Sequence, residues 1–119
     1  MSRQPMPDTV RTALEAELST ARSVTDDTAR WRALERAHVL SQPWPWPHTT
    51  VHWRMLRFAV RQRDRREALG QVVRLIVAAP GSLSGRYPEG NTGRADVGLT
   101  QPMPIPDDLA SILGTADRR

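Results

Sequence analysis

Apolar side chains recur every three or four residues in four stretches of the chain, and this spacing predicts helices that each bury one face. The stretches are residues 9–21, about 27–40, about 48–62 and about 64–79. A shorter segment, 107–114, carries three apolar residues that we expect to dock back onto the others. The connections are short and favour antiparallel neighbours. The predicted class is therefore all-α, a small antiparallel bundle of two helical hairpins, with a tetratricopeptide-like arrangement as a variant.

Polar residues and prolines mark the expected helix ends. Asp26 or Asp27 can cap the second helix, and Asp64 with Glu67 forms the pattern of a capping box for the fourth. Proline alternates with tryptophan over residues 43–47, which predicts a stiff extended connector. Pro80 should end the fourth helix. Its expected buried face consists of Leu69, Val72, Val73, Ile76 and Val77.

The whole chain, residues 1–119, is expected to form one helical domain. Residues 1–8 and 115–119 would be tails. Residues 80–106 are rich in glycine, proline, asparagine and serine, and they predict a structured loop.

Composition excludes several classes of protein. The chain has no cysteine, so it has neither a disulfide framework nor a thiolate metal site. Its longest uninterrupted apolar run, residues 75–79, is far shorter than the roughly 20 residues of a membrane span. Charged residues occupy the first positions, where a signal peptide would be apolar. We expect a cytoplasmic protein with no membrane partner.

All 17 basic residues are arginine, and the formal net charge is +4. Six of the arginines fall between positions 54 and 66. A solvated helix face explains such a cluster, and so does contact with phosphates or an acidic protein. Because no aromatic stacking module accompanies the arginines, nucleic acid is the less favoured partner.

The three histidines are placed so that antiparallel helices would gather them. His38 lies near the end of the second predicted helix, and His48 and His52 lie at the start of the third. Since the end of one helix and the start of its antiparallel neighbour share a level, the three imidazoles can converge. Glu35 precedes His38 by three residues and lies one turn away.

Three imidazoles with one carboxylate suit zinc, iron, cobalt, nickel or copper, whereas magnesium and calcium prefer oxygen ligands. The sequence thus predicts non-catalytic binding of one divalent transition-metal ion by His38, His48 and His52, with Glu35 as a fourth ligand. Sensing, buffering and delivery are the roles that this allows. Ordinary structural explanations also remain: a helix C-terminus for His38, a core position for His52, and an arginine partner for Glu35.

An enzyme is the least favoured class, because the chain contains no nucleophile elbow, phosphate-binding loop, zinc-protease motif or dinucleotide fingerprint. No residue is assigned a catalytic role. The turn 90–93 can bind an anion through its amides, or it can be purely structural. Near it, Glu89, Asn91 and Asp96 are candidates to complete the metal site.

The alternative function is a helical protein-interaction module, acting as a monomer or a homodimer with an unidentified partner. Tryptophan and arginine commonly anchor protein interfaces. The candidate contact residues are Trp31, Trp44, Trp46, Arg54, Arg57 and Arg61.

The order of several short motifs resembles a small bacterial family, the domain of unknown function 3703. The motifs are Leu34–Leu40, His48, Val51–Trp53, Met55–Leu56, Gly70–Gln71, Gly81–Ser82, Gly90–Gly93 and Pro102–Pro106. The resemblance covers about residues 10–114 and implies a single short domain whose proline-rich tail belongs to the fold. It implies no activity and no functional residues.

Overall fold

A computed structural model describes residues 5–84, 90–95, 97 and 101–117 of the chain, and in these residues it contains only α-helices as regular secondary structure. The helices are α1 (Asp8–Ser23), α2 (Asp27–Ser41), α3 (Pro45–Arg61), α4 (Arg65–Ser84) and α5 (Asp107–Asp117). The predicted all-α class is confirmed.

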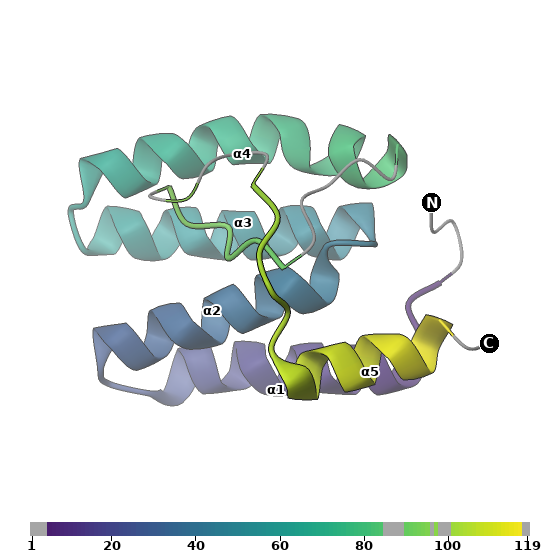
Figure 1. The fold of residues 1–119 in the computed structure, drawn as a ribbon. Coiled ribbons are helices and arrows are strands. Elements are labelled where there is room, and N and C mark those ends of the chain that lie inside the picture. The colour runs from purple at the N-terminus through teal and green to yellow at the C-terminus, as the bar shows by residue number, and fades with distance from the viewer. Residues whose placement is uncertain (1–4, 85–89, 96, 98–100, 118–119) are drawn as a thin grey trace.

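The helices form two antiparallel hairpins that pack side by side. Figure 1 shows α1 with α2 in one hairpin and α3 with α4 in the other, and α2 lies against α3 between them. Residues 101–106 cross the bundle and lead into α5, which packs on α1 and α2. Consequently the end of α2 and the start of α3 lie at one level.

Two of the predicted helix caps are present. The Asp26 carboxylate accepts a hydrogen bond from the Ala29 amide at 2.9 Å, and Asp64 accepts one from the Glu67 amide at 3.0 Å. Each bond satisfies a backbone amide that has no partner within its helix. The capping box is only half formed, because the Glu67 side chain bonds to other groups.

The proline-rich connector is shorter than predicted. Trp44 occupies the N-cap position of α3 and is extended, but Pro45 and Pro47 lie within the first turn of the helix, so the extended conformation expected for residues 43–47 is wrong for residues 45–47. The reason is that amides in a first helical turn lack an intrahelical partner, so proline loses no hydrogen bond there and its φ already suits the helix. Trp44 is 8% exposed and Trp46 is 72% exposed.

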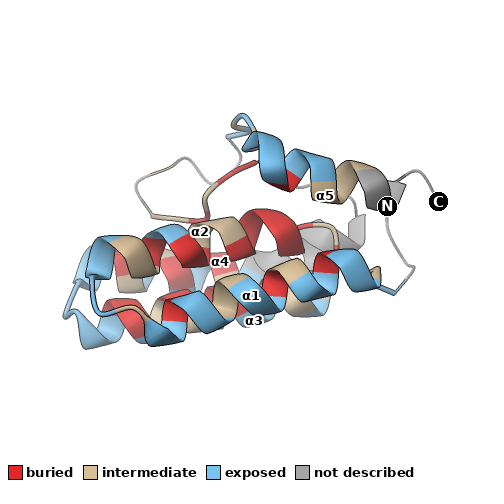
Figure 2. Cartoon of the chain, turned by 90° about the horizontal axis from the view of Figure 1, so that it is seen from below, coloured by how far each residue is buried: buried red, intermediate tan, exposed pale blue. Residues whose placement is uncertain are grey.

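The core lies between the two hairpins and under α5 (Figure 2). In α1 the apolar pattern of residues 9–21 marks the inner face as expected, since Val10, Leu14 and Ala21 are buried. On the last helix Leu109 is buried, and Ile112 and Leu113 pack against the core as expected.

The predicted buried face of α4 is wrong. Leu69 is 69% exposed, Ile76 is 71% exposed, and Val72 and Val73 are also exposed. The helix buries Glu67, Gln71 and Arg74, because these side chains find hydrogen-bond partners on α3, on α4 itself and in the segment 93–97. Val77 belongs to the same prediction, but its side chain lies outside the described residues.

The ends of the last two helices also differ from the prediction. α4 continues through Pro80 to Ser84, and α5 extends beyond residue 114 to Asp117. The prediction took Pro80 as a stop because proline lacks an amide donor, but the loss of one donor does not end this helix. No described helix is both long and apolar enough to span a bilayer.

Truncation of a buried and of an exposed apolar side chain should have unequal effects on stability. Leu40 is fully buried, so Leu40→Ala should lower the free energy of unfolding by about 2–5 kcal/mol. Ile76→Ala should change it by no more than about 0.5 kcal/mol, because the side chain is solvated already. Urea unfolding of the two variants measures both values, and a large loss for Ile76→Ala would contradict this orientation of α4.

Candidate metal centre

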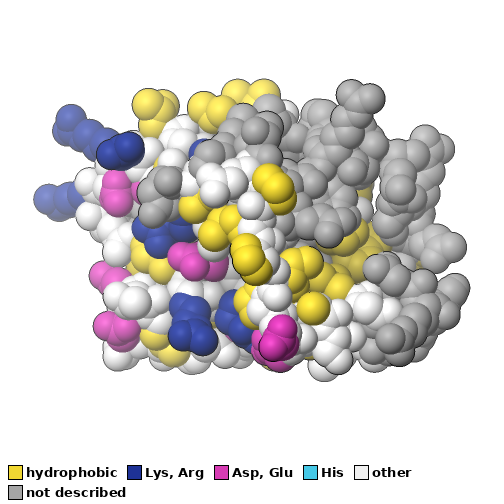
Figure 3. Space-filling view, viewed as in Figure 1, with side chains coloured by type: hydrophobic (Ala, Val, Ile, Leu, Met, Phe, Trp, Pro, Cys, Tyr) yellow, Lys and Arg dark blue, Asp and Glu magenta, His cyan; other side chains and the backbone are white. Residues whose placement is uncertain are grey.

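The two hairpins bring the three histidines together in the interior of the protein. His38 lies in the last turn of α2, while His48 and His52 lie one turn apart in the first half of α3. All three side chains are buried. Accordingly, no histidine side chain is seen among the described residues on the molecular face that Figure 3 shows.

The three Nε2 atoms form a nearly equilateral triangle. They are separated by 3.0 Å between His38 and His52, 3.0 Å between His38 and His48, and 3.2 Å between His48 and His52. A tetrahedral ion with nitrogen ligands at about 2.0–2.1 Å holds them about 3.3–3.4 Å apart. The triangle is therefore close in size to one face of a tetrahedral site.

A backbone carbonyl fixes the tautomer of His38. Its Nδ1 lies 2.7 Å from the carbonyl oxygen of Asn91, which can only accept a hydrogen bond. Nδ1 must therefore carry the proton and donate. In the neutral ring Nε2 is then left with a lone pair that points at the other two imidazoles.

Gln71 fixes the tautomer of His52 in the same way. The Gln71 amide nitrogen donates to Glu67 and to the Gly93 carbonyl, both at 2.7 Å, so its oxygen is the atom that faces His52. His52 Nδ1 donates to this oxygen at 2.7 Å. Two lone pairs, on the Nε2 atoms of His38 and His52, therefore face each other at 3.0 Å. Neutral imidazoles in these tautomers cannot form a hydrogen bond with each other, whereas both can bind one cation.

Burial keeps these imidazoles neutral. Loss of hydration lowers the pKa of His38 well below the usual 6.5, and the neighbouring His52 and His48 lower it further. Burial also lowers the pKa of His52, to about 4. Since a metal ion binds the neutral ring, both residues are in the binding form at neutral pH.

The lowered pKa of His52 predicts that the metal-free protein loses stability in acid. Between pH 6.5 and 4 the unfolded chain binds a proton at this residue and the folded chain does not, so the free energy of unfolding falls as pH falls. The loss attributable to His52 should reach about 3 kcal/mol near pH 4. Urea unfolding at several pH values, with His52→Leu as the comparison, measures it. An equal pH dependence in the variant would contradict the assignment.

The segment 90–95 closes over the histidines. Asn91 contacts His38 and Gly93 contacts Gln71 through their carbonyl groups, while Thr92 and Arg94 line a pocket on the other side of the segment. Gly93 has a φ of +84°, and a Cβ atom there would lie 2.7 Å from the His38 ring. Only glycine fits this position. The turn 90–93 thus holds the imidazoles through its backbone.

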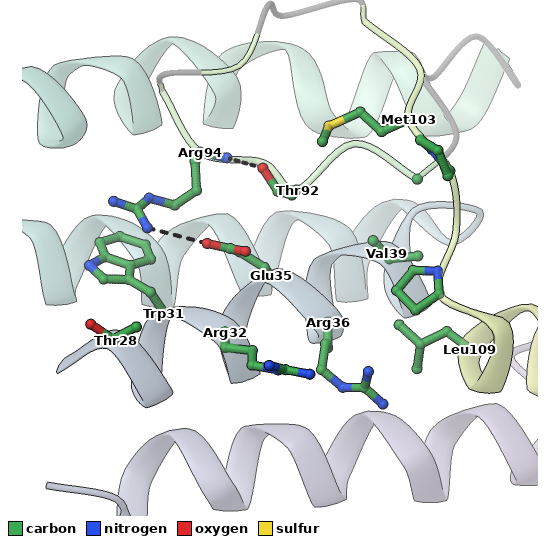
Figure 4. Close-up of a pocket in the computed structure, with 13 residues that line it drawn as sticks. Thr28, Trp31, Arg32, Glu35, Arg36, Val39, Thr92, Arg94, Met103 and Leu109 are labelled. Carbon is green, nitrogen blue, oxygen red and sulfur yellow. Dashed lines mark hydrogen bonds and ion pairs between the residues drawn. The ribbon is translucent and has the colours of Figure 1, made fainter. Parts of the chain in front are cut away.

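Glu35, the predicted fourth ligand, lies outside the histidine group. The atoms within 4.8 Å of one another belong to the three imidazoles. The Glu35 carboxylate instead pairs with Arg94 at 3.2 Å and lines a pocket of about 600 Å³ between α2, residues 90–94, residues 103–106 and α5 (Figure 4). Of the other candidates, Asn91 contributes its carbonyl to His38, and Glu89 and Asp96 lie outside the described residues.

The sequence did not reveal the residues that orient the imidazoles. Glu67 is buried and accepts hydrogen bonds from Gln71, Arg94 and the Ala95 amide. Glu67 and Gln71 are four residues apart and so lie on one face of α4. This pair of polar residues, four apart in a largely apolar helix, is the signal in the sequence that could have indicated a buried polar face.

The residues predicted to contact a partner are dispersed. Trp44 belongs to the core, and Trp31 is buried beside Phe58 and under the guanidinium of Arg94. Trp46 lies at the surface. Arg54, Arg57 and Arg61 all lie on α3 and line a separate pocket between α1, α2 and α3.

Comparison with protein families identifies the family of the chain. A family model described as "Protein of unknown function (DUF3703)" matches residues 8–113 of the 119. No curated protein and no solved structure matches the chain.

Proposed function

Because the chain belongs to the DUF3703 family, whose description assigns no function, we propose from the chain's own side chains that it binds one divalent transition-metal ion through His38, His48 and His52. One observation carries the proposal: the Nε2 atoms of His38 and His52 lie 3.0 Å apart, and each directs a lone pair at the other. The hydrogen bonds of the two Nδ1 atoms fix this arrangement. Imidazoles that ligate metals usually donate their other ring N–H to a carbonyl or carboxylate in this way.

The donor set limits the metal. Three imidazole nitrogens favour zinc, iron, cobalt, nickel or copper over magnesium and calcium. The depth of the site favours holding an ion over chemical turnover, since the segment 90–95 covers the imidazoles. The same segment contacts both His38 and Gln71, so occupancy of the site would affect its position. Among sensing, buffering and delivery, this coupling favours sensing.

Metal analysis of protein purified without a polyhistidine tag tests the proposal. We expect about one zinc, cobalt, nickel or copper ion per chain by elemental analysis, and saturable binding by calorimetry after the ion has been removed and returned. A variant with His38, His48 and His52 all replaced by alanine should bind none. Equal binding by that variant, or no binding by the natural chain, would refute the proposal.

A protein-interaction module remains the second candidate, favoured by the apolar surface of α4. Leu69, Val72, Val73 and Ile76 form an exposed stripe at the spacing that a partner helix would cover. The upper edge of the molecule in Figure 3 shows hydrophobic side chains over this helix. We propose a second copy of the chain as the partner. Sedimentation velocity should show concentration-dependent dimers that Leu69→Glu with Ile76→Glu abolishes; a monomer at all concentrations would refute it.

A further inference from the structure

Five arginines surround a second pocket, of about 350 Å³, which shares no lining residue with the histidine cluster. It lies toward the end of the bundle where α1 ends, α2 begins and α3 ends, at the left of Figure 1. The arginines are Arg22 from α1, Arg30 from α2, and Arg54, Arg57 and Arg61 from α3. No acidic residue lines it.

These arginines have no carboxylate partners within the part of the chain that the structure describes. The four ion pairs found there belong to Arg36 and Arg94. Arg30 is held in place by the carbonyl oxygens of Ala21 and Val24, and its guanidinium lies 5.1 Å from the centre of the Phe58 ring. The pocket is therefore strongly positive and partly preorganised.

The protein groups around Arg54 do not satisfy its guanidinium. Its Nε atom is buried and has no hydrogen-bond partner, and Arg22 and Arg57 repel its charge. A buried N–H without an acceptor costs about 1–3 kcal/mol, more when the group is charged. An anion with several oxygen atoms, bound among these arginines, would neutralise the repulsion.

We propose that this pocket binds a small phosphate-class oxyanion, either free or as the phosphoryl group of a small organic molecule. Guanidinium groups match phosphate oxygens with paired N–H donors, and several of them favour a doubly charged anion over a carboxylate. The pocket volume lies at the lower end of the range for small-ligand sites. Leu34 and Phe58 add an apolar wall suited to the organic part.

Calorimetry and thermal unfolding with inorganic phosphate, pyrophosphate and phenyl phosphate test this proposal. The metal-free protein is used, because pyrophosphate chelates divalent ions, and sodium chloride at equal ionic strength is the reference. We expect saturable binding with a stoichiometry of one and a rise in the unfolding midpoint beyond that in chloride. Tighter binding of phenyl phosphate than of inorganic phosphate assigns an organic ligand, and the reverse assigns a free oxyanion.

Arg54→Met is the decisive variant. It should weaken pyrophosphate binding about 10- to 100-fold, the equivalent of one charge-assisted hydrogen bond, yet leave the ligand-free protein at least as stable, because it removes a repelled charge. Arg66→Gln is the matched control, since Arg66 is exposed on α4 and outside the pocket.

Three results would overturn the proposal. One is stabilisation by pyrophosphate no greater than by chloride. Another is equal weakening by Arg54→Met and Arg66→Gln, which indicates diffuse charge. The third is tighter binding of a short single-stranded DNA than of pyrophosphate with the same loss in both variants, which indicates a nucleic-acid surface.

Discussion

Replacing His38 by alanine should lower the affinity for Co²⁺ or Zn²⁺ by more than the roughly 10- to 100-fold that loss of an outer-shell partner costs. In the proposed site His38 would supply one of three ligand atoms, and its Nε2 lies 3.0 Å from the Nε2 atoms of His48 and His52. The variant should also lose the stabilisation that metal gives to the folded chain. At a free metal concentration 100 times the dissociation constant, that stabilisation is about 2.7 kcal/mol.

A Co²⁺ titration followed by visible absorption measures the affinity, and thermal unfolding with and without the ion measures the stabilisation. Glu35→Gln is the informative control, because Glu35 is paired with Arg94 and lies outside the histidine group. We expect its metal affinity to match that of the natural chain. Loss of binding in Glu35→Gln, or retention of it in His38→Ala, would show that the ligand set is different.

Glu67→Ala should lower the free energy of unfolding by about 3–5 kcal/mol. The buried carboxylate accepts from Arg94 at 2.8 Å, from Gln71 at 2.7 Å and from the Ala95 amide at 2.9 Å. Its removal leaves the Ala95 amide without its acceptor and breaks the closer of the two ion pairs of Arg94, which keeps only Glu35. The Gln71 amide then loses one of its two acceptors and is held less firmly against His52, so metal affinity should fall by roughly 10- to 100-fold as well.

Urea unfolding and the same Co²⁺ titration, applied to Glu67→Ala, separate the two effects. Glu15→Ala provides the matched control, because Glu15 is an exposed carboxylate on α1. It should change stability by no more than about 0.5 kcal/mol and leave metal affinity as it is. A cost below about 1 kcal/mol for Glu67→Ala would contradict the role assigned to this carboxylate.

The helices and the level of the histidines could be predicted because both depend on local spacing. Apolar periodicity located four helices, and short connections implied that His38 would meet His48 and His52. The pairing of His48 with His52 on α3 follows from their separation of four residues, which any helix places on one face. Nothing beyond chain order and helical geometry was required.

The partners of the imidazoles could not be predicted, because they come from distant segments and partly from the backbone. Every residue has a backbone carbonyl, so the sequence does not distinguish those of Asn91 and Gly93. Only the folded loop shows that they orient His38 and Gln71. The orientation of α4 was predicted wrongly for a related reason. An apolar stripe usually faces the core, but here hydrogen bonds to Glu67 and Gln71 turn the opposite face inward.

The distribution of the histidines over the two hairpins has a mechanical consequence. His38 belongs to α1–α2, whereas His48 and His52 belong to α3–α4. A bound ion would therefore cross-link two units that otherwise meet mainly through side-chain packing between α2 and α3. Separation of the hairpins and release of the ion would be one event, so the lifetime of the closed interface would set the residence time of the metal.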